Sequence, residues 1–335
     1  MAADMDSTTI GIIANPLSGK DVRRLLVAAG TSTLEDKISV VRRIAIGARE
    51  VGVDRLLLLP DPHRIGPQAL ERLDGIVGEA APIEQAHNET DTECTAAWMA
   101  DQQCGAVAVL GGDGTSRVVT RAWSDAPLLP ISTGTNNAFP IWIEATVAGA
   151  VLGLVATGAV PIDEVAEPAK VVRIEIEGET DDLALIDALH TDEDMLGFRG
   201  LFDPRHMRTA VLTRAEPAAI GISSIAGLLD PCPPSADRGV HIRFAAGLPD
   251  PPLEVRAPTS PGRYVPVPVE GINRLELGER VEITGPGLLS FDGDRRRRLA
   301  PGQQAWLRVE RDGPRVLDPS RVMAHAAASG HYLVS

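Results

Sequence analysis

A short apolar run that ends abruptly in glycines is the feature that most limits what this chain can fold into. The run, Val107–Leu110, is rich in valine and short for a helix, so it predicts a buried strand. The loop that follows surrounds one carboxylate with small residues: Gly111, Gly112, Asp113, Gly114 and Thr115. Glycines let the backbone turn tightly and approach a ligand, because no Cβ blocks the way. A helix over 116–123 would direct its free N–H groups and positive dipole end at the same place. The corner therefore predicts a phosphate site, with Asp113 beside the phosphate or its magnesium ion.

An ordinary strand–turn–helix corner would explain the same residues, with the glycines serving packing and Asp113 capping the helix. Two further loops favour the phosphate site. The predicted strands over 9–14 and 128–131 both end in polar residues that suit a nucleotide: Asn15, Ser18, Gly19 and Lys20 after the first, and Gly134, Thr135, Asn136 and Asn137 after the second. Ligands bind beyond the carboxyl ends of the strands in a parallel sheet, so we expect the three loops to form one site.

Strands and helices alternate as far as about Gly158. Apolar residues at helical spacing predict helices over 21–29, 38–51, 68–77 and 92–102, and a buried helix within 139–156. A further strand over 55–59 is stopped by Pro60. This alternation implies right-handed crossovers and an α/β domain built on a doubly wound parallel sheet.

Beyond Gly158 the pattern changes to one of antiparallel strands. Proline becomes denser, and alternating segments appear at 170–177, 240–244, 264–269, 280–284 and 305–310. Short helices are expected near 222–229 and over 320–329. We therefore expect an α/β nucleotide-binding domain over 1–158 and a mainly antiparallel β domain over 159–318. A C-terminal helix or tail over 319–335 would return to the first domain.

The three loops, in this order, resemble those of the superfamily of ATP-dependent kinases that holds NAD kinases, diacylglycerol kinases and sphingosine kinases. Residues 15–20 are similar to the N-P-x-S-G-K loop of diacylglycerol kinases, and 111–115 match the G-G-D-G-T that all branches share. Residues 134–139 are similar to G-T-x-N-D-F, with Ala138 in place of the aspartate.

Two later regions add to the resemblance. Residues 291–294 resemble the D-G-E segment, whose acidic residue is associated with catalysis in lipid-kinase relatives. Residues 195–200 and 221–227 are most similar to the acetoin-catabolism protein X group, which is usually placed with the ATP-NAD kinases. The match covers the N-terminal half well and the C-terminal half in patches.

The resemblance implies transfer of a phosphoryl group from ATP, with Mg²⁺, to a hydroxyl of NAD or a related metabolite in a cleft between the domains. Such chemistry needs phosphate positioning, a divalent ion and a group that acts on the attacking hydroxyl. Asp113 and Asp292 are the predicted catalytic carboxylates. The residues predicted to bind the nucleotide all lie in the three loops: Asn15, Ser18, Gly19, Lys20, Gly111, Gly112, Gly114, Thr115, Gly134, Thr135, Asn136 and Asn137.

Two other functions fit the same motifs. A lipid or small polyol kinase of diacylglycerol-kinase type fits 134–139, and the chain has no clear T-G-S-T-A-Y segment of true NAD kinases. A nucleotide-sensing protein without turnover fits Ala138, whereas the intact Asp113 and Asp292 favour a kinase. The acceptor is left open at this point.

The composition agrees with a cytoplasmic enzyme that acts on a nucleotide and a small molecule. The 335 residues carry 46 acidic and 32 basic side chains, a formal charge of −14, which argues against general binding to nucleic acid or anionic membranes. The three cysteines have no metal-ligand spacing, as is typical of a reducing compartment. Residues 1–8 lack the basic segment of a secretory signal. The apolar stretch 139–156 contains Pro140 and Glu144, so it predicts a buried helix rather than a membrane span. A homo-oligomer is left open.

Several charged groups have a plainer interpretation. The run Arg295–Arg298 is expected to be a solvated hairpin turn rather than a phosphate site. The acidic cluster 192–194 is expected to be an exposed loop rather than a magnesium site. The histidines His190, His206 and His241 have no ligand spacing.

Overall fold

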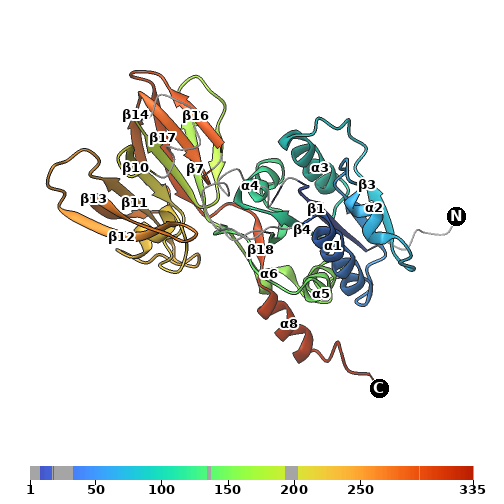
Figure 1. The fold of residues 1–335 in the computed structure, drawn as a ribbon. Helices are drawn as coiled ribbons and strands as arrows, with labels where there is room; N and C mark the ends of the chain where they lie inside the picture. The colour runs from blue at the N-terminus through green and yellow to red at the C-terminus, as the bar shows by residue number, and fades with distance from the viewer. Residues whose placement is uncertain are drawn as a thin grey trace.

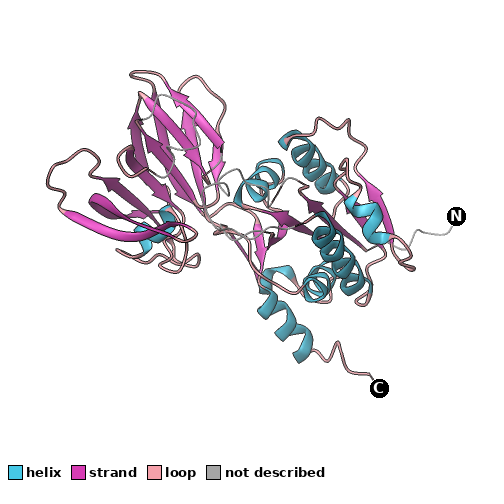
Figure 2. Cartoon of the chain, viewed as in Figure 1, coloured by secondary structure: helices cyan, strands magenta, loops and turns pink. Residues whose placement is uncertain are grey.

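The chain folds into an α/β part and a β-rich part, connected by two neighbouring strands (Figure 1). The computed structural model describes residues 8–16, 18, 33–133, 137–192, 203–293 and 295–334. Figure 2 shows the helices gathered around the first part and the strands dominating the second. The expected helix over 21–29 lies outside the described residues.

The α/β part is built on a seven-stranded sheet with the order β3-β2-β1-β4-β5-β18-β6. Its strands are β1 (Thr9–Ala14), β2 (Arg55–Leu58), β3 (Val77–Ala80), β4 (Ala106–Gly111), β5 (Pro127–Ser132), β6 (Ala166–Pro168) and β18 (Arg315–Leu317). All neighbours pair in parallel except β18 and β6. The order reverses between β1 and β4, and this is the point at which doubly wound sheets bind their ligands. The predicted fold class is confirmed.

Helices cover both faces of this sheet. One face packs against α1 (Leu34–Arg49), α5 (Ala145–Ala156) and α8 (Pro319–Ala328), and the other against α3 (Glu89–Asp101) and α4 (Asp113–Ala122). Glycines allow α1 and α5 to pack closely, because a Cβ on Gly149 would lie 2.0 Å from the carbonyl oxygen of Ile44. β1 and β4 lie buried between the two helix layers, and their carboxyl ends lead into the loops of the site.

One helix prediction needs correction, and another is confirmed with a later start. The segment expected to be a helix over 68–77 instead holds α2 (Ile65–Leu70), a turn and β3. Arg72 and Gly75 have positive φ, at 59° and 80°, and such residues end a right-handed helix. The helix expected within 139–156 begins only at Ala145, because the Glu144 side chain accepts hydrogen bonds from the amides of residues 146 and 147 and caps it.

The β-rich part consists of two antiparallel sheets that pack face to face on a shared apolar core. The larger sheet has the order β12-β13-β11-β10-β9-β15-β16, and the smaller has β14-β17-β7-β8. The strands are β7 (Val171–Ile176), β8 (Asp182–Ala184), β9 (Asp187–Thr191), β10 (Met207–Leu212), β11 (Arg238–Phe244), β12 (Leu253–Ser260), β13 (Arg263–Glu276), β14 (Arg280–Thr284), β15 (Gly287–Phe291), β16 (Arg295–Leu299) and β17 (Gln304–Glu310). A short helix, α7 (Ile222–Gly227), packs on the larger sheet.

The chain crosses between the two parts at β6 and β18. These strands pair with each other, and both belong to the α/β sheet although they lie within 159–318. The last helix, α8, packs on α5 through Val322 and Ala326 and so returns to the α/β part. α6 (Ile162–Val165) lies just before β6.

Candidate active site

The loop between β4 and α4 forms the corner that the sequence predicts. Gly112 is the N-cap residue of α4, and Asp113 is the first residue of the helix. A Cβ on Gly112 would lie 2.8 Å from Oδ1 of Asn137, and one on Gly111 would lie 2.6 Å from Oγ1 of Thr115. A Cβ at either position would therefore displace a polar side chain that surrounds the loop, so glycine lets Thr115 and Asn137 approach the backbone closely.

Asp113 does not cap its own helix. Its carboxylate accepts hydrogen bonds from the backbone amides of Ala138, at 3.2 Å, and Phe139, at 2.8 Å, in the loop after β5. Burial raises the pKa of Asp113 to about 6, and the nearby negative charge of Asp292 adds to this rise. The residue as a whole remains half-buried. A carboxylate with a pKa near neutrality is suited to accept a proton.

The first predicted loop lies beside this corner. Nδ2 of Asn15 donates to Oγ1 of Thr115 at 2.9 Å, so side chains after β1 and β4 meet where the strand order reverses. Oγ of Thr133, after β5, donates to Oγ of Ser18 at 3.1 Å. Nδ2 of Asn137 donates to Oγ of Ser132 at 3.2 Å. The described members of all three loops are therefore in contact with one another.

The remaining predicted binding residues cannot be placed in this way. Gly19, Lys20, Gly134, Thr135 and Asn136 lie outside the described residues. Their roles stay predictions.

Lys37 supports the first loop and was not found by the sequence analysis. Its side chain is only 2% exposed, and Nζ donates to the carbonyl oxygens of Asn15 (2.9 Å), Pro16 (3.0 Å) and Ser18 (2.7 Å). A signal for it was present in the sequence, since Lys37 shares one helical face with the apolar Val41 and Ile44. A cation on a buried face needs partners, and here the loop carbonyls provide them.

The turn after β15 brings Asp292 to the boundary between the two parts. Its side chain is 0% exposed and accepts hydrogen bonds from the amides of Leu185 (3.0 Å), Ile186 (2.8 Å) and Asp187 (3.4 Å). Asp292 has a positive φ of 50°, in the left-handed region that few residues other than glycine adopt. Burial raises its pKa, whereas the guanidinium of Arg117 opposes that rise. The Asp292 carboxylate is thus buried at the boundary between the two parts and has no exposed oxygen.

Three further charged residues at this boundary were also missed. Asp187 is buried, and burial together with the charge of Asp292 raises its pKa well above the ordinary value. Nε of Arg117 lies 3.6 Å from Oδ2 of Asp292. Nη1 of Arg214 donates to the carbonyl oxygen of Ala138 at 3.3 Å, and its guanidinium carbon lies 5.3 Å from the centre of the Phe139 ring. No sequence motif marked these residues, because their charges meet only when the two parts pack together.

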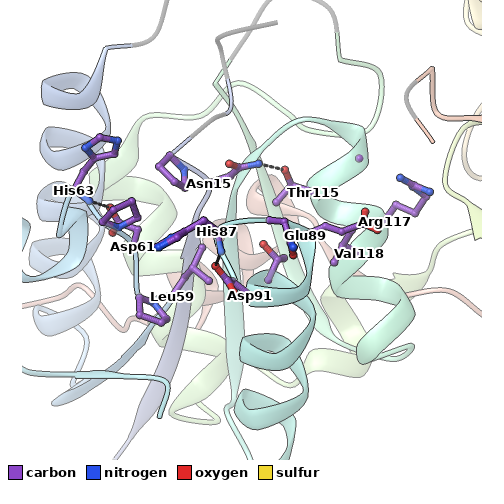
Figure 3. Close-up of a pocket in the computed structure, with 16 residues that line it drawn as sticks. Asn15, Leu59, Asp61, His63, His87, Glu89, Asp91, Thr115, Arg117 and Val118 are labelled. Carbon is purple, nitrogen blue, oxygen red and sulfur yellow. Dashed lines mark hydrogen bonds between the residues drawn. The ribbon is translucent and has the colours of Figure 1, made fainter. Parts of the chain in front are cut away.

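A cavity of about 210 Å³ lies at the N-terminus of α4, on the side away from the boundary with the β-rich part (Figure 3). Figure 3 shows Asn15 and Thr115 on one side of it and Asp61 and His63 on another. Its lining also includes Gly114 and Arg117. The α4 N-terminus therefore lies between an open cavity and the charged boundary with the β-rich part.

The donor set fits phosphate better than it fits a protein-built metal site. Within the described ranges, no group of three or more histidine, cysteine, aspartate or glutamate side chains could hold a metal ion. Magnesium often binds through one or two carboxylates and the substrate's phosphates, and keeps several waters. Asp113, a half-buried residue, is the described carboxylate that lies at the phosphate corner for such a role.

The other charged groups singled out in the sequence lie away from this corner or in different structures from those expected. The arginine run 295–298 falls in β16, which pairs with β15, so the expectation of a hairpin turn was wrong: the backbone of this run is an extended strand. Nη1 of Arg297 lies 3.4 Å from Oε2 of Glu179. Asp192 pairs with His206 and Arg208, while residues 193 and 194 lie outside the described residues.

Comparisons with known proteins agree with this architecture. Residues 67–159 match the family model of the ATP-NAD kinase N-terminal domain, and 170–312 match that of the acetoin catabolism protein X C-terminal domain. Acetoin catabolism protein X of Cupriavidus necator is 34% identical over 346 residues, which cover 97% of this chain and 93% of that protein. The chain belongs to the acetoin catabolism protein X family.

A solved structure shares the fold of this acetoin catabolism protein X family member. Yeast NADH kinase complexed with NADH aligns with a TM-score of 0.52 and 12% identity, over 98% of this chain and 89% of its own. The family model matched by the first part is thus that of ATP-NAD kinases, and the fold of the whole chain is the one seen in yeast NADH kinase. None of the helices in the described part of the chain is long and apolar enough to span a membrane.

Proposed function

We propose that this protein transfers a phosphoryl group from ATP, with Mg²⁺, to a hydroxyl of NAD or a related metabolite. The observation that carries the proposal is Asp113, a half-buried carboxylate with a pKa raised to about 6, at the first turn of a helix that follows a glycine loop. A group that titrates near neutrality at the site of a bound phosphate is suited to general-base chemistry.

Each described loop has a part in this proposal. The backbone amides of Gly114 and its neighbours at the α4 N-terminus would hold phosphate oxygens, with Asn15 and Thr115 beside them. Asp113 would accept the proton of the attacking hydroxyl. Magnesium bound with ATP would neutralise phosphate charge. Asp292, with no exposed oxygen, would act as a positioning residue that holds the segment 185–187 against the site.

The cavity beside α4 supports binding of the nucleotide on that side. It is lined by polar groups from the ends of β1 and β2 and from the N-termini of α3 and α4. The acceptor would then approach from the opposite side, where Asp187 and Arg214 of the β-rich part face Asp113.

The residue at position 138 bears on the choice between acceptors. Lipid kinases of the diacylglycerol type have aspartate in this loop, whereas Ala138 adds no negative charge beside Arg214, whose Nη1 donates to the backbone carbonyl of Ala138. A cation at this place favours an acceptor with negative charge, such as a dinucleotide, over a neutral lipid or polyol. A lipid or polyol kinase, and a nucleotide sensor without turnover, remain the competing functions.

Thermal melting with nucleotides tests the binding half of the proposal. Millimolar ATP with magnesium should raise the melting temperature, because a ligand specific to the folded state stabilises it by mass action. An ATP-consumption assay across NAD and a panel of metabolites then tests turnover. Melting that is unchanged by ATP, NAD and NADP would overturn the nucleotide site, and binding without turnover would favour the sensor.

A further inference from the structure

Arg117 is a buried cation at the boundary between the nucleotide corner and the β-rich part. It lies on α4 four residues after Asp113, so both side chains are on one face of the helix. Its side chain is 3% exposed, and its one ionic partner among the described residues is Asp292, itself 0% exposed. The pair joins the helix that follows the glycine loop to the turn that follows β15.

This ion pair is incomplete. Nε of Arg117 lies 3.6 Å from Oδ2 of Asp292, which is too long for a hydrogen bond. Neither Nε nor Nη1 donates a hydrogen bond to any residue that the structure describes. Oδ1 and Oδ2 of Asp292 instead accept from the amides of 185–187. Leaving the N–H groups of a buried guanidinium unpaired is costly, so the site favours an additional anion.

The position of Arg117 indicates which anion would satisfy it. Arg117 lines the cavity together with Gly114 and Thr115 at the α4 N-terminus. Figure 3 shows its side chain leaving α4 on the side away from His63, so the guanidinium points away from the other labelled residues and toward the boundary that holds Asp292. A phosphate chain that follows the helix N-terminus from the cavity toward Asp113 would end beside it. The guanidinium fork matches phosphate oxygens with two parallel hydrogen bonds.

Building on the proposed function, we infer that Arg117 binds the terminal phosphate of a nucleoside triphosphate and exchanges its long contact with Asp292 for that phosphate. The residue then determines the preference for a triphosphate over a diphosphate. Asp292 holds the guanidinium in place before the nucleotide arrives. Because the proposal concerns binding, it can be tested without knowledge of the acceptor.

The test compares the dissociation constants of MgATP and MgADP by calorimetry for the wild type, Arg117→Gln and Arg117→Lys. The wild type should bind MgATP at least about tenfold more tightly than MgADP, as expected for hydrogen bonds to a charged group. In Arg117→Gln this ratio should fall to near one, with the affinity for MgADP unchanged. Arg117→Lys keeps the charge but loses the fork, so its ratio should be intermediate.

Arg121→Gln is the matched control. Arg121 lies one turn further along α4, and its Nη2 pairs with Oε2 of Glu93 at 2.7 Å on the helix exterior. This variant should keep the wild-type ratio. If Arg117→Gln unfolds because Asp292 is left unpaired, the double variant Arg117→Gln with Asp292→Asn removes both partners and should also lose the preference.

The outcomes separate this inference from the proposed function. A wild type that binds neither MgATP nor MgADP contradicts the nucleotide site itself. Two other results would overturn the role of Arg117 without contradicting the nucleotide site. In one, the wild type binds MgATP and MgADP equally; in the other, Arg117→Gln or the double variant keeps the preference for MgATP.

Discussion

The turns after β4 and after β15 are built alike and behave differently. Each places an aspartate beside glycine at the end of a buried strand, and each aspartate accepts hydrogen bonds from backbone amides of another segment. Asp113 stays half-buried next to an open cavity, and its pKa is raised to about 6. Asp292 is sealed at the boundary with the β-rich part against Arg117.

The difference lies in what packs over each carboxylate and not in the local sequence. The loop after β5 donates two backbone amides to Asp113, whereas segment 185–187 and Arg117 of α4 enclose Asp292. Under the proposed function, the first turn would serve proton transfer and the second would couple the two parts of the structure. Four substitutions or conditions test this assignment.

The largest effect is expected at the first turn. Asp113→Asn should lower the rate of NADP formation from ATP and NAD by between about a hundredfold and ten-thousandfold, because it removes the proton acceptor while keeping the shape of the side chain. Melting curves serve as the control for folding. A variant that keeps most of the wild-type rate would make Asp113 a structural residue and remove the contrast between the two turns.

Asp292→Asn should affect stability more than chemistry. The substitution leaves the buried Arg117 without a counter-charge, and breaking such a pair costs about 3 kcal/mol of unfolding free energy. Denaturant titration measures this loss. The rate at saturating substrate should fall less than for Asp113→Asn, with ATP affinity little changed.

The matched control for Asp292→Asn is the double variant with Arg117→Gln, in which neither charge is left alone. It should recover part of the lost stability. If Asp292→Asn is as stable as the wild type but as inactive as Asp113→Asn, Asp292 acts directly in the reaction and the two turns share one role.

Lys37→Met tests whether the turn after β4 depends on the neighbouring loop after β1, which Lys37 holds. Losing the ammonium leaves three loop carbonyls without their donor, so the free energy of unfolding should fall by about 1–3 kcal/mol. The affinity for MgATP should weaken as well, since Asn15 contacts Thr115. Lys37→Arg keeps the charge and is the control. An unchanged affinity in a destabilised Lys37→Met would limit Lys37 to folding.

The smallest expected effect is the dependence of the reaction rate on pH. A base with a pKa of about 6 is ionised above that value, so the rate should rise with pH and reach half of its plateau near pH 6. Initial rates between pH 5 and 8 would measure this. A profile that is flat from pH 5 to 8 would exclude Asp113 as the titrating base.

Stability should change with pH in the opposite sense at this residue. The pKa of Asp113 is higher in the folded chain than its ordinary value of 3.8, so its contribution favours the folded state below pH 3.8 and is lost as the pH rises through 6. Asp113→Asn lacks this pH-dependent contribution to stability, because its side chain does not titrate. The melting temperature of the variant relative to the wild type should therefore increase from pH 5 to 7.5.

The sequence was sufficient for the α/β sheet and for the phosphate corner, because both depend on local patterns. Apolar runs rich in isoleucine and valine predict β1 and β4, and glycines 111 and 112 make close contacts within a few residues or with one neighbouring loop. The helix expected over 68–77 failed where two positive-φ residues reverse the chain, a property that apolar spacing does not report.

The boundary residues could not be predicted in this way. Arg117 and Asp292 are 175 positions apart, and Asp187 and Arg214 come from different strands or loops of the β-rich part. Their burial and pKa shifts arise from packing between the parts. Lys37 could be predicted in part. The sequence places it on an apolar face of a helix, but it does not indicate which carbonyl oxygens accept its hydrogen bonds.

The position of β18 between β5 and β6 sets an order of events during synthesis. The first five strands of the α/β sheet are complete once residue 132 has emerged, but the strand that flanks β5 is made only at 315–317. Until then the nascent chain carries an open strand edge, of the kind that pairs readily with other chains. The nucleotide corner lies one strand inward from that edge, so its final rigidity waits on nearly the whole chain leaving the ribosome.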